Sequence, residues 1–306
     1  MKSNSDKQPF WTRSKRSIKM KKAFSMVELI MTIVIMGILA GSSYVAISHL
    51  FTKSAKTKAI SELSFDTTLI SNQISALLSY RIPSTVIGYD TNTSDFVSIY
   101  DIDKQYNVLE WIGMDFAKYK EKKYSGLVDF NRSDKSINMI YSPDTADING
   151  SALIFAGSFD DGSVVYGGDF NNSFGWHGNN HTKIFEINST STSSELGLTS
   201  TPSKIYEKYY LLKSAYAIAK YDDNLSSCVD EMYKNKNYLL LFYDYKPWKG
   251  ENFCDNAKVT ILSTQTKGFK VDFVDENLQF NLTLQREIRK KGKNLQIQIS
   301  KQKVVF

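Results

Sequence analysis

Histidine and cysteine, two residue types that are common in active sites, are scarce in this sequence. Among its 306 residues are three histidines and two cysteines, and no Gly-x-Ser-x-Gly, glycine-rich phosphate loop or His-Glu-x-x-His motif is present. His177 and His181 are spaced as two metal ligands could be, but no third histidine or cysteine lies near them. We therefore expect solvated loop histidines, no cofactor and a protein that is not an enzyme.

A net positive charge is absent beyond the first 23 residues. The net charge is +6, but residues 1–23 hold eight basic residues and one acid, so subtracting their +7 leaves −1 for residues 24–306. Basic residues ahead of an apolar run hold the N-terminus in the cytoplasm. The charge balance therefore gives no sign that the rest of the chain binds nucleic acid. Whether Met1 or Met20 is the start affects only this basic segment.

Charge is absent altogether from Leu29 to Ile47. Counted from Phe24, the apolar stretch is about 24 residues long, and about 20 are enough for a helix to span a bilayer. Its one acid is Glu28. An acidic side chain in the apolar core of a membrane costs several kcal/mol and is usually functional. Glu28 is therefore the residue that any proposed function must explain.

Residues 23–29 read Ala23-Phe24-Ser25-Met26-Val27-Glu28-Leu29. This stretch resembles the processing motif of the type IV pilin and type II secretion pseudopilin family, in which a small residue, usually glycine, precedes Phe-Thr-Leu-Ile-Glu-Leu or a variant. The resemblance implies cleavage by prepilin peptidase between Ala23 and Phe24 and N-methylation of Phe24. It also implies that Glu28 neutralises the amino terminus of a neighbouring subunit. The departure is Ala23, one small residue in place of another.

Two other N-terminal arrangements need comparison with this one. They are a secretory signal cut near residues 40–42 and a plain single-pass anchor. Neither requires Glu28 inside the apolar run or Phe24 directly after a small residue. We favour the pilin-like interpretation, which implies a single-pass protein of a bacterial inner membrane with its head in the periplasm, later in a pilus or pseudopilus. The implied partners are other pilins or pseudopilins, prepilin peptidase and an inner-membrane assembly platform.

The helical pattern continues beyond the apolar run. Residues 52–79 contain no proline or glycine, and apolar residues recur three, four and seven positions apart on one helix face. These are Ala59, Leu63, Ile70, Ile74 and Leu77. Pro83 stops the helix, because proline disfavours helical geometry in the preceding residue. We expect a leader (1–23), then one helix of about 55 residues with a transmembrane half (24–50) and an amphipathic half (51–82). A coiled-coil dimer is the alternative partner for its apolar face.

Beyond the helix the pattern is that of short β-strands between turns. In a variable β-rich segment, 83–203, we expect strands at 96–100, 108–112, 126–130, 137–141, 152–156 and 163–166. Residues 189–203 hold ten Ser or Thr in fifteen, which predicts an exposed loop. Residues 204–306 are expected to form a C-terminal antiparallel sheet, with buried strands at 238–243 and 259–262 and three alternating ones around 269–273, 280–284 and 295–299. Residues 206–221 favour a strand at their start.

The predicted fold class is α+β, with a long N-terminal helix packed on an antiparallel sheet. This layout also resembles the pilin α/β roll, and its size resembles a large minor pseudopilin or minor pilin. The predicted function is a structural fibre subunit of a type II secretion or type IV pilus-like system. The alternative is a membrane-tethered periplasmic binding domain or enzyme that does not assemble.

Two cysteines, Cys228 and Cys254, lie far downstream of the apolar run. If the leader is cytoplasmic, they lie outside the inner membrane, where disulfides persist. A bond between them would close a loop of about 26 residues and contribute about 3.5 kcal/mol in the chain-entropy model. We predict this disulfide; the alternative is two buried thiols.

Eight Asn-x-Ser/Thr sequences occur, and six of them have an acid two residues before the asparagine. The six asparagines are Asn92, Asn131, Asn149, Asn171, Asn188 and Asn224. The pattern resembles the extended acceptor sequence of bacterial periplasmic oligosaccharyltransferases and would imply glycosylation. The alternative is that Asp and Asn cluster in turns.

Two charged patterns have simple structural explanations. The acidic turns Asp160-Asp161-Gly162 and Asp222-Asp223-Asn224 could hold calcium, but the twelve-residue loop pattern is absent, which favours solvated turns. A basic cluster could contact phosphate if the fibre takes up DNA, although a charged hairpin turn that keeps a sheet edge soluble is simpler. The cluster comprises Arg286, Arg289, Lys290, Lys291 and Lys293.

Overall fold

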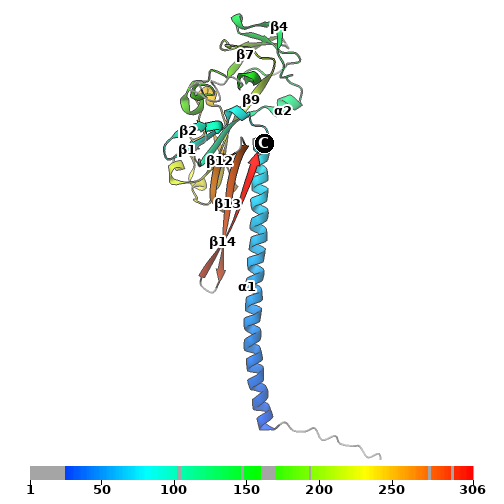
Figure 1. The fold of residues 1–306 in the computed structure, drawn as a ribbon, viewed down its shortest axis with the longest axis vertical. Coiled ribbons are helices and arrows are strands. Elements are labelled where there is room, and N and C mark those ends of the chain that lie inside the picture. The colour runs from blue at the N-terminus through cyan, green and yellow to red at the C-terminus, as the bar shows by residue number, and fades with distance from the viewer. Residues whose placement is uncertain are drawn as a thin grey trace, which may run out of the picture. The chain divides into compact units, whose positions relative to one another are not determined.

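The computed structural model describes residues 25–101, 105–145, 148–159, 170–192, 194–274, 277–290 and 293–305. The chain divides into two compact units, Met1–Ser54 and Ala55–Phe306. The described part of the first unit is the beginning of helix α1 (Met26–Leu78), and the second unit contains the remainder of α1 and the β-sheets (Figure 1).

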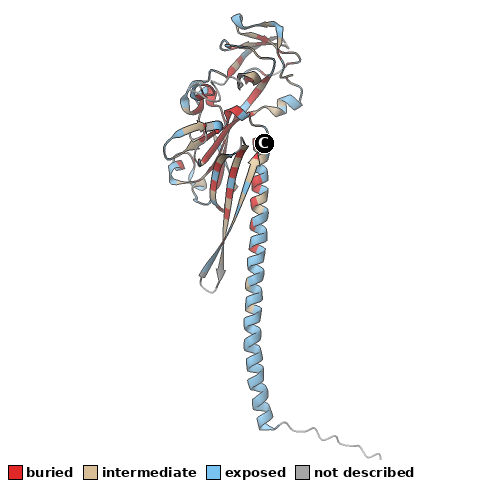
Figure 2. Cartoon of the chain, in the orientation of Figure 1, coloured by how far each residue is buried: buried red, intermediate tan, exposed pale blue. Residues whose placement is uncertain are grey.

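Helix α1 is continuous over 53 residues, which confirms the prediction of one long helix. It ends five residues before Pro83, at Leu78. In the second unit one face of the helix is buried, and the colours of Figure 2 mark it as a stripe. The stripe is formed by Ala59, Leu63, Thr67, Ile70, Ser71, Ile74 and Leu78. Four of the five residues predicted for this face are in it, and Leu77, the fifth, is half-buried beside it.

The larger sheet runs in the order β2-β1-β3-β9-β6-β7-β8-β5-β4, with β10 on β9 and β11 on β10. Its strands, antiparallel throughout the described pairings, are β1 (Ile87–Asp90), β2 (Asp95–Ser98), β3 (Val108–Met114), β4 (Asp129–Asp134), β5 (Met139–Tyr141), β6 (Ala152–Phe155), β7 (Phe185–Thr192), β8 (Glu195–Leu198), β9 (Tyr209–Lys220), β10 (Leu239–Tyr245) and β11 (Lys258–Ser263). A short helix, α2 (Phe116–Lys120), follows β3.

The second sheet is the antiparallel meander β12 (Thr266–Val274), β13 (Asn277–Lys290) and β14 (Lys293–Val305). The buried stripe of α1 packs in one apolar cluster with residues of β3, β9, β10 and this meander. Arg286 on β13 also forms ion pairs with Glu62 and Asp66 of α1. The helix face therefore has its cover within the same chain, as the α+β prediction required.

Several strand predictions need correction. The expected loop at 189–203 contains the end of β7 and all of β8, because Ile187, Leu196 and Leu198 are buried and threonine suits a pleated strand. The strand expected at 126–130 begins only at Asp129. Residues 259–262 lie on an edge strand and are half-buried or exposed. The strand expected at 163–166 lies outside the described residues.

Candidate functional site

The N-terminus of α1 is closed by two reciprocal hydrogen bonds between Ser25 and Glu28. The backbone N–H of Glu28 donates to Ser25 Oγ at 3.2 Å, and the backbone N–H of Ser25 donates to Glu28 Oε2 at 3.4 Å. This is a capping box, in which both side chains satisfy N–H groups that the helix leaves unpaired. A carboxylate in the first turn is also favoured by the helix dipole. Glu28 Oε1 forms no hydrogen bond with any described residue.

Behind Glu28 the helix exposes a long stretch of mainly apolar side chains. None of the described residues from Ser25 to Ser54 is buried. Among the described residues, α1 is the helix long and apolar enough, by length and composition, to cross a membrane. Met26 is 83% exposed and Phe51 is 73% exposed, so large side chains are uncovered at both ends of this part. An apolar surface of this extent needs a lipid or protein environment.

Two glycines lie one helical turn apart in the same apolar part. Gly37 and Gly41 have no other atoms within 4 Å of the position that a Cβ would take. Glycines spaced in this way allow the backbone of another helix to approach closely inside a membrane. The Gly-x-x-x-Gly spacing and the Ser-x-x-Glu of the capping box are local sequence patterns, so the sequence alone was enough to find both.

The two predicted processing residues, Ala23 and Phe24, lie outside the described residues. The chain is described from Ser25, the residue directly after Phe24. The structure therefore places Glu28 and the start of the helix, and the cleavage and methylation sites remain predictions.

Cys228 and Cys254 are joined by a disulfide. It connects a segment after the 3-10 turn Asp223–Leu225 to the segment before β11. Both cysteines are partly buried and pack against the apolar cluster on the face of β9 away from α1. No free cysteine is present. The predicted bridge therefore ties two loops of the sheet together.

His177 has a buried partner that sequence reasoning missed. Its Nε2–H donates to Glu110 Oε1 at 2.9 Å, and the Tyr245 hydroxyl donates to Glu110 Oε2 at 2.8 Å. Glu110 is 1% exposed, and the His177 ring stacks on Tyr89 with centroids 4.3 Å apart. The expectation of a solvated histidine is therefore wrong for His177, whereas His181 is exposed.

The buried carboxylate changes the titration of both partners. Burial opposes protonation of the His177 imidazole, but the charge of Glu110 and the hydrogen bond to it outweigh burial and raise the pKa of His177. Burial, together with Glu110, raises the pKa of Tyr245 well above its usual value. No group of three or more His, Cys, Asp or Glu among the described residues is placed to hold a metal ion. The network is thus a buried hydrogen-bonded cluster between β3, β10 and the 3-10 turn at residues 176–178.

The acidic turns have structural partners where they are described. Asp222 Oδ1 accepts from the backbone N–H of Asn224 at 3.0 Å, and Asp223 is ion-paired with Lys236 at 2.7 Å. These carboxylates cap a turn and neutralise a lysine, which agrees with a turn rather than a calcium loop. Asp160-Asp161-Gly162 lies outside the described residues.

The same geometry accounts for part of the asparagine pattern. The acid two residues before Asn92, Asn131 and Asn224 accepts a hydrogen bond from the backbone N–H of that asparagine. This is an Asx turn, which places the acid at this spacing for a structural reason. All six asparagines in the pattern are exposed. Glycosylation stays a prediction.

Arg286 is the member of the predicted basic cluster whose side chain the structure describes. Arg286 is engaged by Glu62 and Asp66 of α1 and by Gln265. Its guanidinium is therefore committed to holding β13 on the helix. Lys291 lies outside the described residues, and nothing is described of the side chains of Arg289, Lys290 and Lys293.

Residues 18–44 match the family described as the prokaryotic N-terminal methylation motif. No curated protein and no solved structure matches the chain significantly. The match and the long apolar helix support assignment to the type IV pilin and pseudopilin family and a precursor that prepilin peptidase processes. The similarity is confined to the first part of the chain, so the rest is interpreted from its own structure.

Proposed function

We propose that the chain, which carries a prepilin-type methylation motif, is a non-enzymatic minor subunit of a type II secretion pseudopilus or a type IV pilus-like fibre. The observation that carries the proposal is Glu28, a lone carboxylate in the first turn of α1, ahead of a mainly apolar stretch in which no residue up to Ser54 is buried. Prepilin peptidase would cleave between Ala23 and Phe24, and the amine of Phe24 would be methylated. The helix would then leave the membrane by packing in a bundle of like helices.

In this mechanism Glu28 has two tasks. One oxygen, Oε2, belongs to the capping box, while Oε1 is free of described partners and can meet an amine from outside the chain. In a dry bundle an unpaired carboxylate is costly, so pairing with the methylated Phe24 amine of a neighbour would fix the axial register between subunits. Gly37 and Gly41 would allow close approach of a neighbouring helix behind this contact.

The proposal places the first unit in the inner membrane and the second unit in the periplasm. The disulfide supports this, because such bonds persist outside the cytoplasm. The partners would be other pilins or pseudopilins, prepilin peptidase and an assembly platform in the inner membrane. The large head favours a minor subunit, by analogy. Contact with nucleic acid would be expected only if the fibre serves DNA uptake.

The alternative is a periplasmic binding domain or enzyme tethered by an uncleaved anchor or released by a cut near residues 40–42. It leaves Glu28 with the capping role alone. N-terminal sequencing and intact mass of protein purified from its own host separate the two proposals. A mature chain that begins at methylated Phe24 supports the fibre subunit. A chain that begins elsewhere contradicts it.

A further inference from the structure

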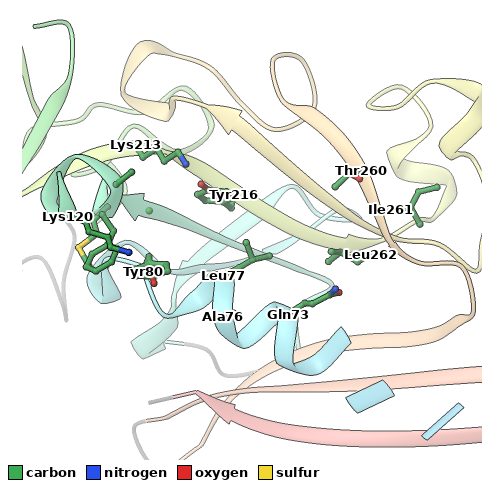
Figure 3. Close-up of a pocket in the computed structure, with 14 residues that line it drawn as sticks. Gln73, Ala76, Leu77, Tyr80, Lys120, Lys213, Tyr216, Thr260, Ile261 and Leu262 are labelled. Carbon is green, nitrogen blue, oxygen red and sulfur yellow. The ribbon is translucent and has the colours of Figure 1, made fainter. Parts of the chain in front are cut away.

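The second unit contains an open groove that the proposed function does not use (Figure 3). It has a volume of about 860 Å³ and runs between the last turns of α1 and strand β11. Its apolar lining includes Leu77 of α1, Tyr216 of β9, and Ile261 and Leu262 of β11. A second hollow of about 420 Å³, lined by the same two β11 residues, continues it along the helix. We call the two together the α1–β11 groove.

One wall of the α1–β11 groove is the edge of the larger sheet. Strand β11 pairs with β10 along one side and with no described strand along the other. Near its start, the Val259 carbonyl accepts a hydrogen bond from the Tyr233 hydroxyl, and Lys258 is ion-paired with Asp244. Residues 260–262 carry no charge or proline that would protect an edge. This part of the edge is therefore open to an extended segment of another chain.

The part of the groove beside α2 and the start of β9 is positively charged. Lys120 of α2 and Lys213 of β9 both line it, and both are exposed. Neither ammonium group forms an ion pair or hydrogen bond with any described residue. Two uncompensated lysines beside an apolar floor favour a ligand that has acidic and apolar groups close together.

We infer that the α1–β11 groove binds an extended, acidic segment of a partner protein. The segment lies along residues 260–262, places apolar side chains over Leu77 and Tyr216, and brings one or two carboxylates to Lys120 and Lys213. Addition of a strand to an open sheet edge, with pockets for alternate side chains, is a recurring mode of peptide recognition. The inference goes beyond fibre assembly through α1, because every residue that carries it belongs to the second unit.

The test uses the full chain in its own host, with a photo-crosslinking amino acid at Ala76. Ala76 lines the groove and is exposed. Ala55 is an exposed alanine of the same helix outside the groove and serves as the matched position. We expect from position 76 an adduct that position 55 does not give. Mass spectrometry of the adduct should identify a peptide of another protein with Asp or Glu beside the crosslinked residue.

Charge reversal completes the test. The double substitution Lys120→Glu and Lys213→Glu should lower the adduct yield about tenfold or more, because like charges at a contact are strongly unfavourable. Lys267→Glu with Lys270→Glu changes the net charge equally at exposed sites on β12 and should leave the yield unchanged. The inference is overturned by no adduct, by a crosslinked peptide without acids, by an adduct to a second copy of this chain, or by equal effects of the two double substitutions.

Discussion

Glu28 and Ser25 each accept a hydrogen bond from the backbone N–H of the other, so the acid in the apolar helix is also part of its N-cap. This relationship matters for any mutation of Glu28. Loss of assembly in an alanine variant could follow from loss of the cap or from loss of the charge. The two effects can be separated, because glutamine also completes a capping box but carries no charge.

The first prediction concerns assembly of the fibre. Glu28→Gln, Glu28→Ala and Glu28→Val should each leave the head folded and lower incorporation into sheared fibres or pseudopili by more than about tenfold, since the partner's amine would be left uncompensated in the bundle. Ser25→Ala weakens the cap by about 1 kcal/mol but keeps the charge, so its incorporation should be close to normal. Immunoblots of the sheared fraction measure the incorporation of each variant. Normal incorporation of Glu28→Gln would leave Glu28 with the capping role only.

The second prediction concerns the dependence of stability on pH. The folded-state pKa of His177 is raised, so its protonation stabilises the fold fully below its unfolded pKa of about 6.5. That contribution is lost as the pH rises through the folded pKa. The free energy of unfolding should therefore decline as the pH is raised from about 6 through the folded-state pKa of His177. Urea denaturation followed by tryptophan fluorescence at a series of pH values measures this decline.

A matched pair of variants isolates this contribution. His177 has a φ of 52°, in the left-handed region that asparagine tolerates. His177→Asn should therefore keep the turn and remove the pH-dependent contribution. His181→Asn changes an exposed histidine four residues away and should keep the wild-type profile. A profile unchanged in His177→Asn would show that the contact with Glu110 does not govern stability in this pH range.

The third prediction concerns the disulfide. Replacing both Cys228 and Cys254 by serine opens a covalent loop with a sequence separation of 26. In the chain-entropy model the free energy of unfolding should fall by about 3.5 kcal/mol. Chemical denaturation of the oxidised wild type and the double variant measures the difference. Equal midpoints would show that packing of the two loops, and not the covalent link, holds this part of the sheet.

The fourth prediction concerns glycosylation at the six acid-preceded asparagines. If these sites are used, the intact mass of protein from its own host should exceed that of the bare mature chain by whole glycan units. Asn224→Gln should then remove one unit at most, and Asn180→Gln, at a sequence without the preceding acid, should remove none. An intact mass equal to that of the bare chain would leave the acids with their role in turns, as Asp222 shows.

The periodic elements were predictable from the sequence, and the contacts between distant residues were not. Apolar spacing along α1 and strict alternation in β12–β14 are local signals, and both gave the right elements. The β7–β8 hairpin was missed because its Ser- and Thr-rich sequence is also typical of loops. Glu110, His177 and Tyr245 are separated by 67 or more positions, so no local pattern could bring them together. The α1–β11 groove depends on packing in the same way.

The ion pair between Arg286 and Glu62 has a consequence for biosynthesis, because the two residues are 224 positions apart. Ribosomes add about 5–20 residues per second, so the amphipathic half of α1 waits roughly 11–45 s for the strand that covers it. Lys301 and Lys303, which bind Thr68 and Asn72, arrive later still. The apolar stripe of the nascent helix therefore stays uncovered by its own chain until the last hairpin closes over it.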